Sequence, residues 1–265
     1  MSLGDLSSMG RSVLRSSLLP PAITREWLKS TSLTSDPSSA VGMPWEILRM
    51  DVPISPDSNK TRVVDVYSKN GGLGGYSSYI FLSPDHNIGL TVLVASPDVQ
   101  PTGTVALAVL SKLALATWIP AAEAAAREAT IANLAGTYAA ANGANSTISL
   151  QVVPGYKGLR IDEFTYNGVS PFELLGQDGA TLQYMNLQDD GKLAFRSIPQ
   201  SLRPPSTEPA PFGLFGECSF DWSAVDTFKY GGFGLDEFIV DVDETGKATA
   251  VHAPALRASF LRTDA

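Results

Sequence analysis

The stretch whose residue types are best suited to chemistry runs from Lys69 to Tyr76 and reads Lys-Asn-Gly-Gly-Leu-Gly-Gly-Tyr. It lies between two runs that are typical of β-strands. A lysine in so glycine-rich a setting favours an active-site position. The alternative is a surface lysine that ends an edge strand and discourages pairing with other strands. Gly74 and Gly75 indicate a bend rather than a phosphate-binding loop, because no helix follows them.

The other candidate groups indicate structure rather than catalysis. His86 and His252 lack the spacing of metal ligands, and we expect both to be solvated surface residues. Cys218 is the single cysteine, which excludes an intrachain disulfide and a cysteine-rich metal site, and we expect its thiol to be buried and inert. The acidic run 241–244 lacks the glycine and the later glutamate of a calcium loop. We therefore predict no metal site and no cofactor.

Composition narrows the range of partners. A chain of 265 residues with 44% apolar and 17% charged residues suits one large or two modest globular domains. The net charge of −8 argues against nucleic acid or an anionic membrane as the main partner. We expect no membrane span, because no apolar run reaches the roughly 18 residues that one needs, and the first residues lack the pattern of a signal peptide. The compartment stays open.

The elements that must hold Lys69 belong to a mixed first half. The apolar spacing predicts a helix from about Leu6 to Leu14 and a second helix over 21–29, followed by a loop over 31–39. Strands are expected at 45–49, 63–68, 76–82 and 88–95, the last two forming an antiparallel hairpin around a Ser-Pro-Asp-His-Asn turn. An alanine- and leucine-rich helix is expected over 104–132, with an interruption near Pro120.

The character of the chain changes at about residue 133, where short strands begin to alternate with Gly, Asn and Asp turns. This spacing predicts an antiparallel barrel or sandwich. We therefore expect an α+β protein with two domains, 1–132 and 133–265. The expected strands of the second domain are 147–153, 158–161, 172–175, 182–187, 193–198, 238–242 and 255–261, and 203–211 is an expected exposed loop.

The first half resembles the second half of serine β-lactamase-like proteins, which include class C β-lactamases, DD-peptidases and related esterases. The added β-rich domain is most similar to the fungal type, whose full-length members are expected to be secreted. The resemblance rests on the order of elements and on five short stretches: Asp5-Leu6, Pro44-Trp45-Glu46, Lys69 to Tyr76, Ser83-Pro84-Asp85 and Ile88 to Leu93. It implies a β-lactamase/transpeptidase-like fold, of which this chain holds only part.

In this family Lys69-Asn70-Gly71 takes the place of the Lys-Thr-Gly element that lines the substrate groove. The resemblance implies that Lys69 attracts a substrate carboxylate, that Asn70 hydrogen-bonds it, and that Gly71 leaves room for the substrate backbone. The N–H of Gly72 would supply half of an oxyanion hole, a donor worth about 3 kcal/mol in a dry site.

Two elements of that family are absent. No serine stands three residues before any of the eight lysines, so the chain has no Ser-x-x-Lys nucleophile motif. No Tyr-x-Asn or Ser-x-Asn element precedes Lys69; Tyr184-Met185-Asn186 fits the pattern but follows Lys69, and we interpret it as chance. Without a nucleophile no tetrahedral intermediate forms, and we predict little or no acyl transfer.

Three functional hypotheses follow. The chain is a truncated or degenerate hydrolase, a pseudoenzyme for ester, amide or β-lactam substrates. Alternatively, it is a non-catalytic protein whose β domain binds a small apolar ligand or a partner. In the third reading it is part of a longer product that includes the missing half. A half domain also predicts exposed apolar surface beside strands 76–82 and 88–95, and with it a missing N-terminal half or a homo-oligomer.

Overall fold

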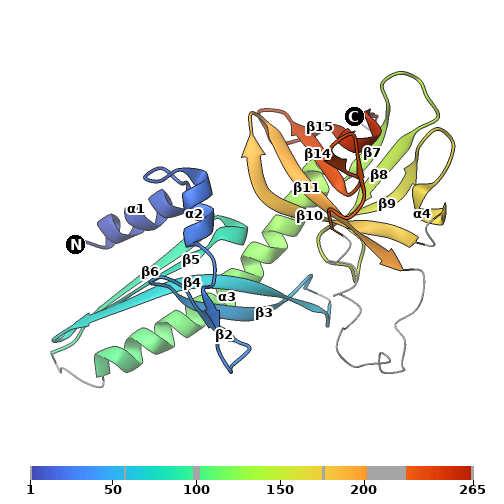
Figure 1. The fold of residues 1–265 in the computed structure, drawn as a ribbon. Coiled ribbons are helices and arrows are strands. Elements are labelled where there is room, and N and C mark those ends of the chain that lie inside the picture. Colours follow the sequence, from blue (N-terminus) through green and yellow to red (C-terminus); the bar gives the residue numbers. More distant parts are fainter. Residues whose placement is uncertain (1, 57, 98–101, 175–176, 202–224, 264–265) are drawn as a thin grey trace. The chain divides into compact units, whose positions relative to one another are not determined.

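The computed structural model describes residues 2–56, 58–97, 102–174, 177–201 and 225–263, and its contacts divide the chain into two compact units. Unit 1 is Met1–Ala126 and unit 2 is Arg127–Ala265. The expected domain boundary at 133 coincides with the end of a helix, whereas the division by contacts falls inside that helix. The α+β class is confirmed (Figure 1).

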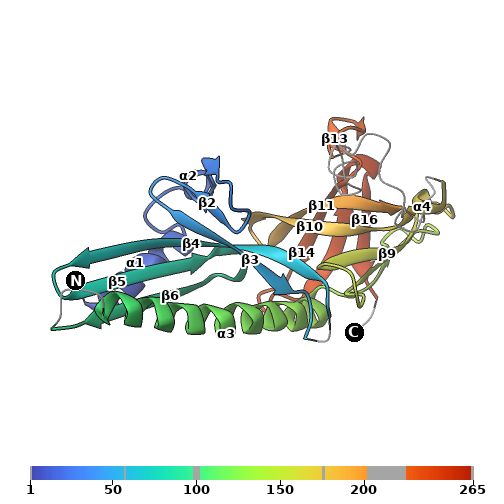
Figure 2. The same cartoon turned by 90° about the horizontal axis from the view of Figure 1, so that it is seen from below.

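Unit 1 is a six-stranded antiparallel sheet in sequential order, with helices on both faces (Figure 2). The strands are β1 (Ser32–Leu33), β2 (Ser39–Val41), β3 (Glu46–Pro53), β4 (Thr61–Leu73), β5 (Tyr76–Ser83) and β6 (Ile88–Ala95). The helices are α1 (Leu3–Leu14), α2 (Pro21–Trp27), the 3-10 turn η1 (Pro84–His86) and α3 (Thr102–Asn133). The expected loop at 31–39 therefore contains β1 and the start of β2.

The hairpin of β5 and β6 confirms the strongest strand prediction, and its turn is η1 as the Pro-Asp signal indicated. Alternate residues of the sheet feed two apolar clusters, because successive side chains of a strand point to opposite faces. Tyr67, Ile80 and Leu82 pack with α1 and α2. Val64, Val66 and Phe81 pack with Leu115 and Ile119 of α3.

Helix α3 runs unbroken from Thr102 to Asn133, so the expected interruption at Pro120 is wrong. Pro120 and Ala116, whose carbonyl loses its helical partner, both lie on an exposed side, where water can satisfy the carbonyl. Because the helix is continuous, Gly103–Asn133 qualifies as a candidate membrane span by length and composition alone. The core helix of a globular domain meets the same criteria of length and composition, so this helix is only weak evidence for a membrane span.

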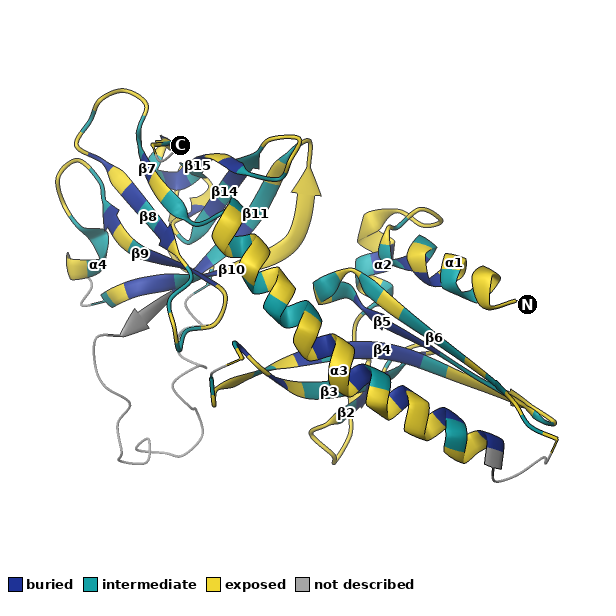
Figure 3. Ribbon diagram, turned by 180° about the vertical axis from the view of Figure 1, so that it is seen from behind, coloured by how far each residue is buried: buried dark blue, intermediate teal, exposed yellow. Residues whose placement is uncertain are grey.

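Only one narrow stripe of α3 is buried in unit 1. Gly103, Leu107, Ser111, Leu115 and Ile119 recur at intervals of four residues, which places them on one side of the helix. The other sides carry large apolar side chains that are 46–63% exposed, as Figure 3 shows along the helix: Val105, Val109, Leu110, Leu113 and Trp118. The expected exposed apolar surface thus lies mainly on α3. Leu93 of β6 is 42% exposed and projects from the other face of the sheet, because its neighbour Val92 packs on the α3 side.

Unit 2 contains a closed eight-stranded antiparallel barrel, one of the two architectures, barrel or sandwich, that the turn spacing predicted. Its order is β10-β11-β14-β15-β16-β7-β8-β9. The bounds are β7 (Gly136–Ala140), β8 (Thr147–Gln151), β9 (Leu159–Thr165), β10 (Gln177–Asp189), β11 (Lys192–Ser201), β14 (Glu237–Val242), β15 (Ala248–Ala253) and β16 (Ala258–Arg262). A separate two-stranded sheet joins β12 (Lys229–Tyr230) to β13 (Phe233–Gly234).

Several details of unit 2 differ from expectation. Where a strand was expected at 172–175, the described residues form helix α4 (Pro171–Leu174). Strand β15 was not foreseen, and a 3-10 turn, η2 (Pro254–Leu256), takes up the start of the strand expected at 255–261. One of the expected Asp and Gly turns joins β10 to β11 at Asp190 and Gly191, and both residues have the positive φ that a tight hairpin needs. Cys218 and the loop expected at 203–211 lie outside the described residues.

The barrel interior is filled by side chains. Tyr138, Phe164, Phe195, Phe238 and Phe260 are all less than 9% exposed and pack with buried aliphatic residues from the same strands. Phe164 meets Phe238 and Phe260 edge to face, with ring centroids 6.2 and 5.9 Å apart. A filled interior counts against the hypothesis that the barrel encloses a small apolar ligand.

Candidate functional site

The glycine-rich stretch lies at the end of β4, where only one of the two strand edges is paired. Lys69 pairs with Ile80 of β5, and Gly72 pairs with Ser77. On the other side β3 stops at Glu46, which pairs with Ser68. Among the described residues, no strand therefore pairs with the outer edge of 69–73. An extended substrate backbone could add itself at such an edge.

The ammonium of Lys69 is held by two oxygens. Its Nζ donates to Glu46 Oε1 at 2.5 Å and to Asn70 Oδ1 at 3.3 Å. The side chains of Lys69 and Glu46 are 42% and 41% exposed. Of the predicted site residues, the structure thus brings Lys69 and Asn70 together. Glu46 lies with them, although the sequence indicated it only as part of the stretch Pro44-Trp45-Glu46 and not as a site residue.

The glycines of this stretch are required for different reasons. A Cβ on Gly75 would lie 2.2 Å from the Ser96 carbonyl oxygen, and Gly74 has a φ of +56°, so both serve the hairpin bend as predicted. A Cβ on Gly71 would meet Ser78 Oγ at 3.0 Å. A Cβ on Gly72 would come no closer than 3.8 Å to any atom. Packing therefore does not require glycine at position 72.

The face of the sheet that carries Lys69 is rigidly supported. Tyr67, two residues earlier on β4, donates from its hydroxyl to the Leu28 carbonyl at 2.6 Å. Burial, with the nearby charges of Asp65 and Asp85, raises the pKa of Tyr67 to about 12. Trp45, beside Glu46, is 3% exposed and packs edge-on against Tyr67. The contacts of Tyr67 and Trp45 therefore hold the backbone next to Lys69 and Glu46 in place.

A cavity of about 220 Å³ opens on the same face, between α1 and the strands β5 and β6. Arg11, Arg15 and Thr91 line it together with Ile80 and Leu82. Neither Lys69 nor the glycine stretch contributes to its lining. The cavity therefore does not belong to the candidate site.

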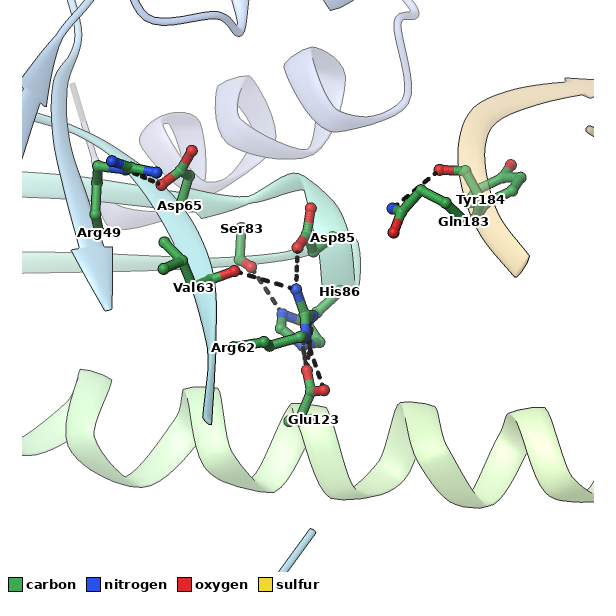
Figure 4. A network of polar contacts seen from close by, with 10 residues as sticks. All are labelled: Arg49, Arg62, Val63, Asp65, Ser83, Asp85, His86, Glu123, Gln183 and Tyr184. Atoms are coloured by element: carbon green, nitrogen blue, oxygen red, sulfur yellow. Dashed lines mark hydrogen bonds and ion pairs between the residues drawn. The ribbon is translucent and has the colours of Figure 1, made fainter. Parts of the chain in front are cut away.

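A second polar cluster lies on the opposite face of the sheet and joins it to α3 (Figure 4). Arg62 donates from Nε and Nη2 to the two carboxylate oxygens of Glu123 at 2.8 and 2.7 Å, and from Nη1 to Asp85 at 2.7 Å. His86 lies between Glu123 and Ser83, 2.9 Å from an oxygen of each. This group is called the clasp below.

The clasp corrects the prediction for His86. Its side chain is 2% exposed, not solvated, because the turn η1 folds it against Glu123. Burial would raise the pKa of Glu123, but hydrogen bonds from His86 and Arg62 outweigh it and lower the pKa to about 2. Burial alone would lower the pKa of Arg62, and the bonds to Glu123 and Asp85 raise it. Sequence gave no signal for this partnership.

Ser83, His86 and Glu123 have the residue types of a hydrolytic triad. However, Ser83 is 2% exposed and His86 is equally buried, so no substrate reaches the hydroxyl. The carboxylate of Glu123 is also saturated by the bidentate contact of Arg62. The clasp is a structural device that fastens α3 to the sheet.

In unit 2 the second histidine also has partners. His252 is 27% exposed; its Nε2 lies 2.9 Å from Asp241 and its Nδ1 lies 2.9 Å from Ser259, which corrects the expectation of a solvated residue. Burial would raise the pKa of Asp241, but Lys192 and His252 lower it. Asp243 accepts from the backbone N–H groups of the following turn. The acidic run thus builds strand contacts and a turn.

Two further predictions concern the Tyr-x-Asn match and the absence of a metal site. Tyr184-Met185-Asn186 lies on β10 in unit 2, where Asn186 adopts a φ of +52° at an irregular point of the strand. Across the residues that the structure describes, no three His, Cys, Asp or Glu side chains come together as metal ligands. The chemistry of the candidate site is therefore that of Lys69, Asn70, Glu46 and the backbone of the glycines.

Comparison with known proteins adds family evidence. A family model described as "Beta-lactamase-like-like, C-terminal domain" matches residues 125–264. A "Beta-lactamase-like protein" of Arthroderma benhamiae is 28% identical, over 98% of this chain and 48% of its own length. "Probable hydrolase clz13" of Cochliobolus lunatus is 30% identical, over 63% of this chain and 25% of its own length. The chain thus spans about half or less of the length of these relatives.

A solved structure, the octameric penicillin-binding protein homologue from Pyrococcus abyssi, also aligns with the chain. The alignment covers 98% of this chain and 46% of that one, at 14% identity. Its TM-score is 0.31, and a likeness at that level carries no argument.

Proposed function

The chain belongs to the β-lactamase-like proteins, whose C-terminal domain it carries, and from that premise we propose that it supplies the substrate-side wall of a hydrolase. The reaction would be acyl transfer from an ester, amide or β-lactam through an acyl-enzyme. One observation carries the proposal: 69–73 forms a glycine-rich edge with no strand partner among the described residues, and Lys69 and Asn70 stand at its start.

The wall has three parts with separate tasks. The open edge of β4 aligns an extended acyl group by backbone hydrogen bonds. The N–H of Gly72 stabilises the oxyanion of a tetrahedral intermediate, in the position where packing leaves a Cβ-sized space. Lys69 supplies positive potential beside the reacting carbonyl. None of these groups is a nucleophile, so the chain alone does not form an acyl-enzyme.

The nucleophile comes from a second half-domain. The relatives extend well beyond the part that matches this chain, and the matched family is a C-terminal domain. That additional length supplies the Ser-x-x-Lys element, either within a longer product or as a separate chain. The second half-domain would also cover the exposed apolar side of α3. It would cover the free edge of β6 as well, because β6 is the last strand of the sheet and carries no charged residue.

Labelling experiments test this function. The chain alone should react neither with a fluorescent penicillin nor with a fluorescent fluorophosphonate, and it should not hydrolyse p-nitrophenyl butyrate. Stoichiometric labelling of the chain alone would overturn the proposed division of the site.

The chain is then co-expressed with the part of the Arthroderma relative that lies outside the aligned region. The pair should take up fluorophosphonate and hydrolyse the ester. Lys69→Met should remove most of the activity, and the exposed Lys157→Met should keep it. A pair that forms a complex but stays inactive would refute the proposal.

A further inference from the structure

The ammonium group of Lys69 already forms an ion pair with a carboxylate of the same chain, that of Glu46. Glu46 Oε1 accepts from Lys69 Nζ at 2.5 Å, a short charge-assisted contact. Asn70 turns its amide oxygen, Oδ1, toward the same ammonium at 3.3 Å, which leaves its NH2 group to point elsewhere. The place beside Lys69 where a substrate carboxylate would bind is therefore held by Glu46.

Glu46 is held in this position by the fold. It is the first residue of β3 and pairs with Ser68 of β4, the neighbour of Lys69. Ser68 Oγ also donates to the Glu46 carbonyl at 2.7 Å. The preceding residue, Trp45, is 3% exposed and anchored against Trp27, with ring centroids 5.0 Å apart. The carboxylate thus starts from a fixed backbone next to Lys69.

A tethered carboxylate competes strongly with a free one. Because Glu46 is attached to the adjacent strand, its effective concentration at Lys69 is on the order of millimolar or higher. A substrate carboxylate would have to displace it and would then lie beside a second negative charge. A neutral ester or amide meets no such opposition, because it needs only the backbone edge and the amide of Asn70.

We propose that Glu46 is a specificity-determining residue that excludes carboxylates from Lys69 and selects neutral acyl groups. The substrates would be esters or amides that carry no carboxylate beside the scissile bond. This inference rests on the proposed function of the wall. It narrows that function, because penicillins and peptides with a free C-terminus carry such a carboxylate.

A binding experiment tests this selection without a nucleophile. N-acetylglycine, a carboxylate, and N-acetylglycinamide, its neutral counterpart, are titrated into the full chain. Binding is followed by NMR at the amides of Asn70, Gly71 and Gly72. In the wild type the carboxylate should bind no better than the amide. In Glu46→Gln the carboxylate should bind about fivefold more tightly, the factor that matches loss of one exposed competing ion pair.

Matched variants separate local competition from net charge. Asp51→Asn removes one negative charge from the exposed end of the same strand and should leave both affinities unchanged. Lys69→Met combined with Glu46→Gln should abolish the gain. An unchanged carboxylate preference in Glu46→Gln, including no detectable binding of either probe, would overturn the inference.

Failure here differs from failure of the proposed function. If the reconstituted pair hydrolyses p-nitrophenyl butyrate but Glu46→Gln leaves the carboxylate preference unchanged, the function stands and the role of Glu46 falls. If the pair is inactive while Glu46→Gln gains carboxylate affinity, Glu46 does compete with carboxylates at Lys69, but the proposed hydrolase function is wrong.

Discussion

Replacing Glu123 by glutamine removes the centre of the clasp that fastens α3 to the sheet. Glu123 is 13% exposed and receives two hydrogen bonds from Arg62 and a third contact from His86. Glutamine has nearly the same shape but no charge. Arg62 then keeps only Asp85 as an anionic partner. The substitution therefore isolates the charge from the packing.

The pKa of Glu123 sets the size of the effect and its dependence on pH. A value of about 2 in the folded state, against 4.5 when unperturbed, corresponds to about 3 kcal/mol of unfolding free energy at pH 7. Because the folded pKa is depressed, this contribution is present above pH 4.5 and is lost as the pH falls toward 2. At pH 3 about 1 kcal/mol should remain.

Urea unfolding at pH 7 and pH 3 measures this difference. Tryptophan fluorescence reports on unit 1, which holds Trp27, Trp45 and Trp118, three of the four tryptophans. Glu128→Gln on the same helix, where the side chain is exposed, is the control and should change stability by less than about 0.5 kcal/mol. An equal loss at both pH values, or an equal loss in the control, would refute the electrostatic account.

Three other substitutions probe the hairpin of β4 and β5, the barrel and the free edge of β6. Gly75→Ala should cost unit 1 about 1–3 kcal/mol in urea unfolding, because its Cβ would lie 2.2 Å from the Ser96 carbonyl oxygen; a stability change near zero would contradict this. Phe260→Ala should cost the barrel about 3–5 kcal/mol by circular dichroism melting, whereas Leu261→Ala, 50% exposed, should cost far less; equal losses would contradict the assigned strand faces. Leu93→Lys should weaken any concentration-dependent self-association seen by analytical ultracentrifugation, since a charge on β6 opposes edge pairing; unchanged association would exclude this edge.

Local patterns predicted the elements that depend on neighbours in the sequence. The hairpin of β5 and β6 followed from two apolar runs around a Pro-Asp turn, and the barrel followed from regularly spaced turns. The error at α4 has the same origin: Pro171–Leu174 is short and apolar, and such a run does not distinguish a helix from a strand. Helix α3 continues through Pro120, whose exposed position the sequence alone does not reveal.

Contacts between distant residues could not be predicted in this way. His86 and Glu123 are 37 positions apart, and only the packing of α3 on the sheet brings them together. Glu46 and Lys69 are 23 positions apart and meet because β3 pairs with β4 in one register. A histidine in a polar turn and a glutamate in an alanine-rich helix each look solvated when taken alone. The burial that corrects this view belongs to the fold.

Strand β4 carries two cations whose surroundings lead to opposite roles. Arg62 and Lys69 stand an odd number of residues apart and therefore project from opposite faces of the sheet. Arg62 is bound through two hydrogen bonds by Glu123, which is 13% exposed and also contacts His86, so exchanging this partner would break the attachment of α3. Lys69 is 42% exposed, has one carboxylate partner and borders an open strand edge, so its partner can exchange without loss of the fold. We therefore expect ligands to bind this strand on the face of Lys69, where a substrate carboxylate would have to compete with Glu46.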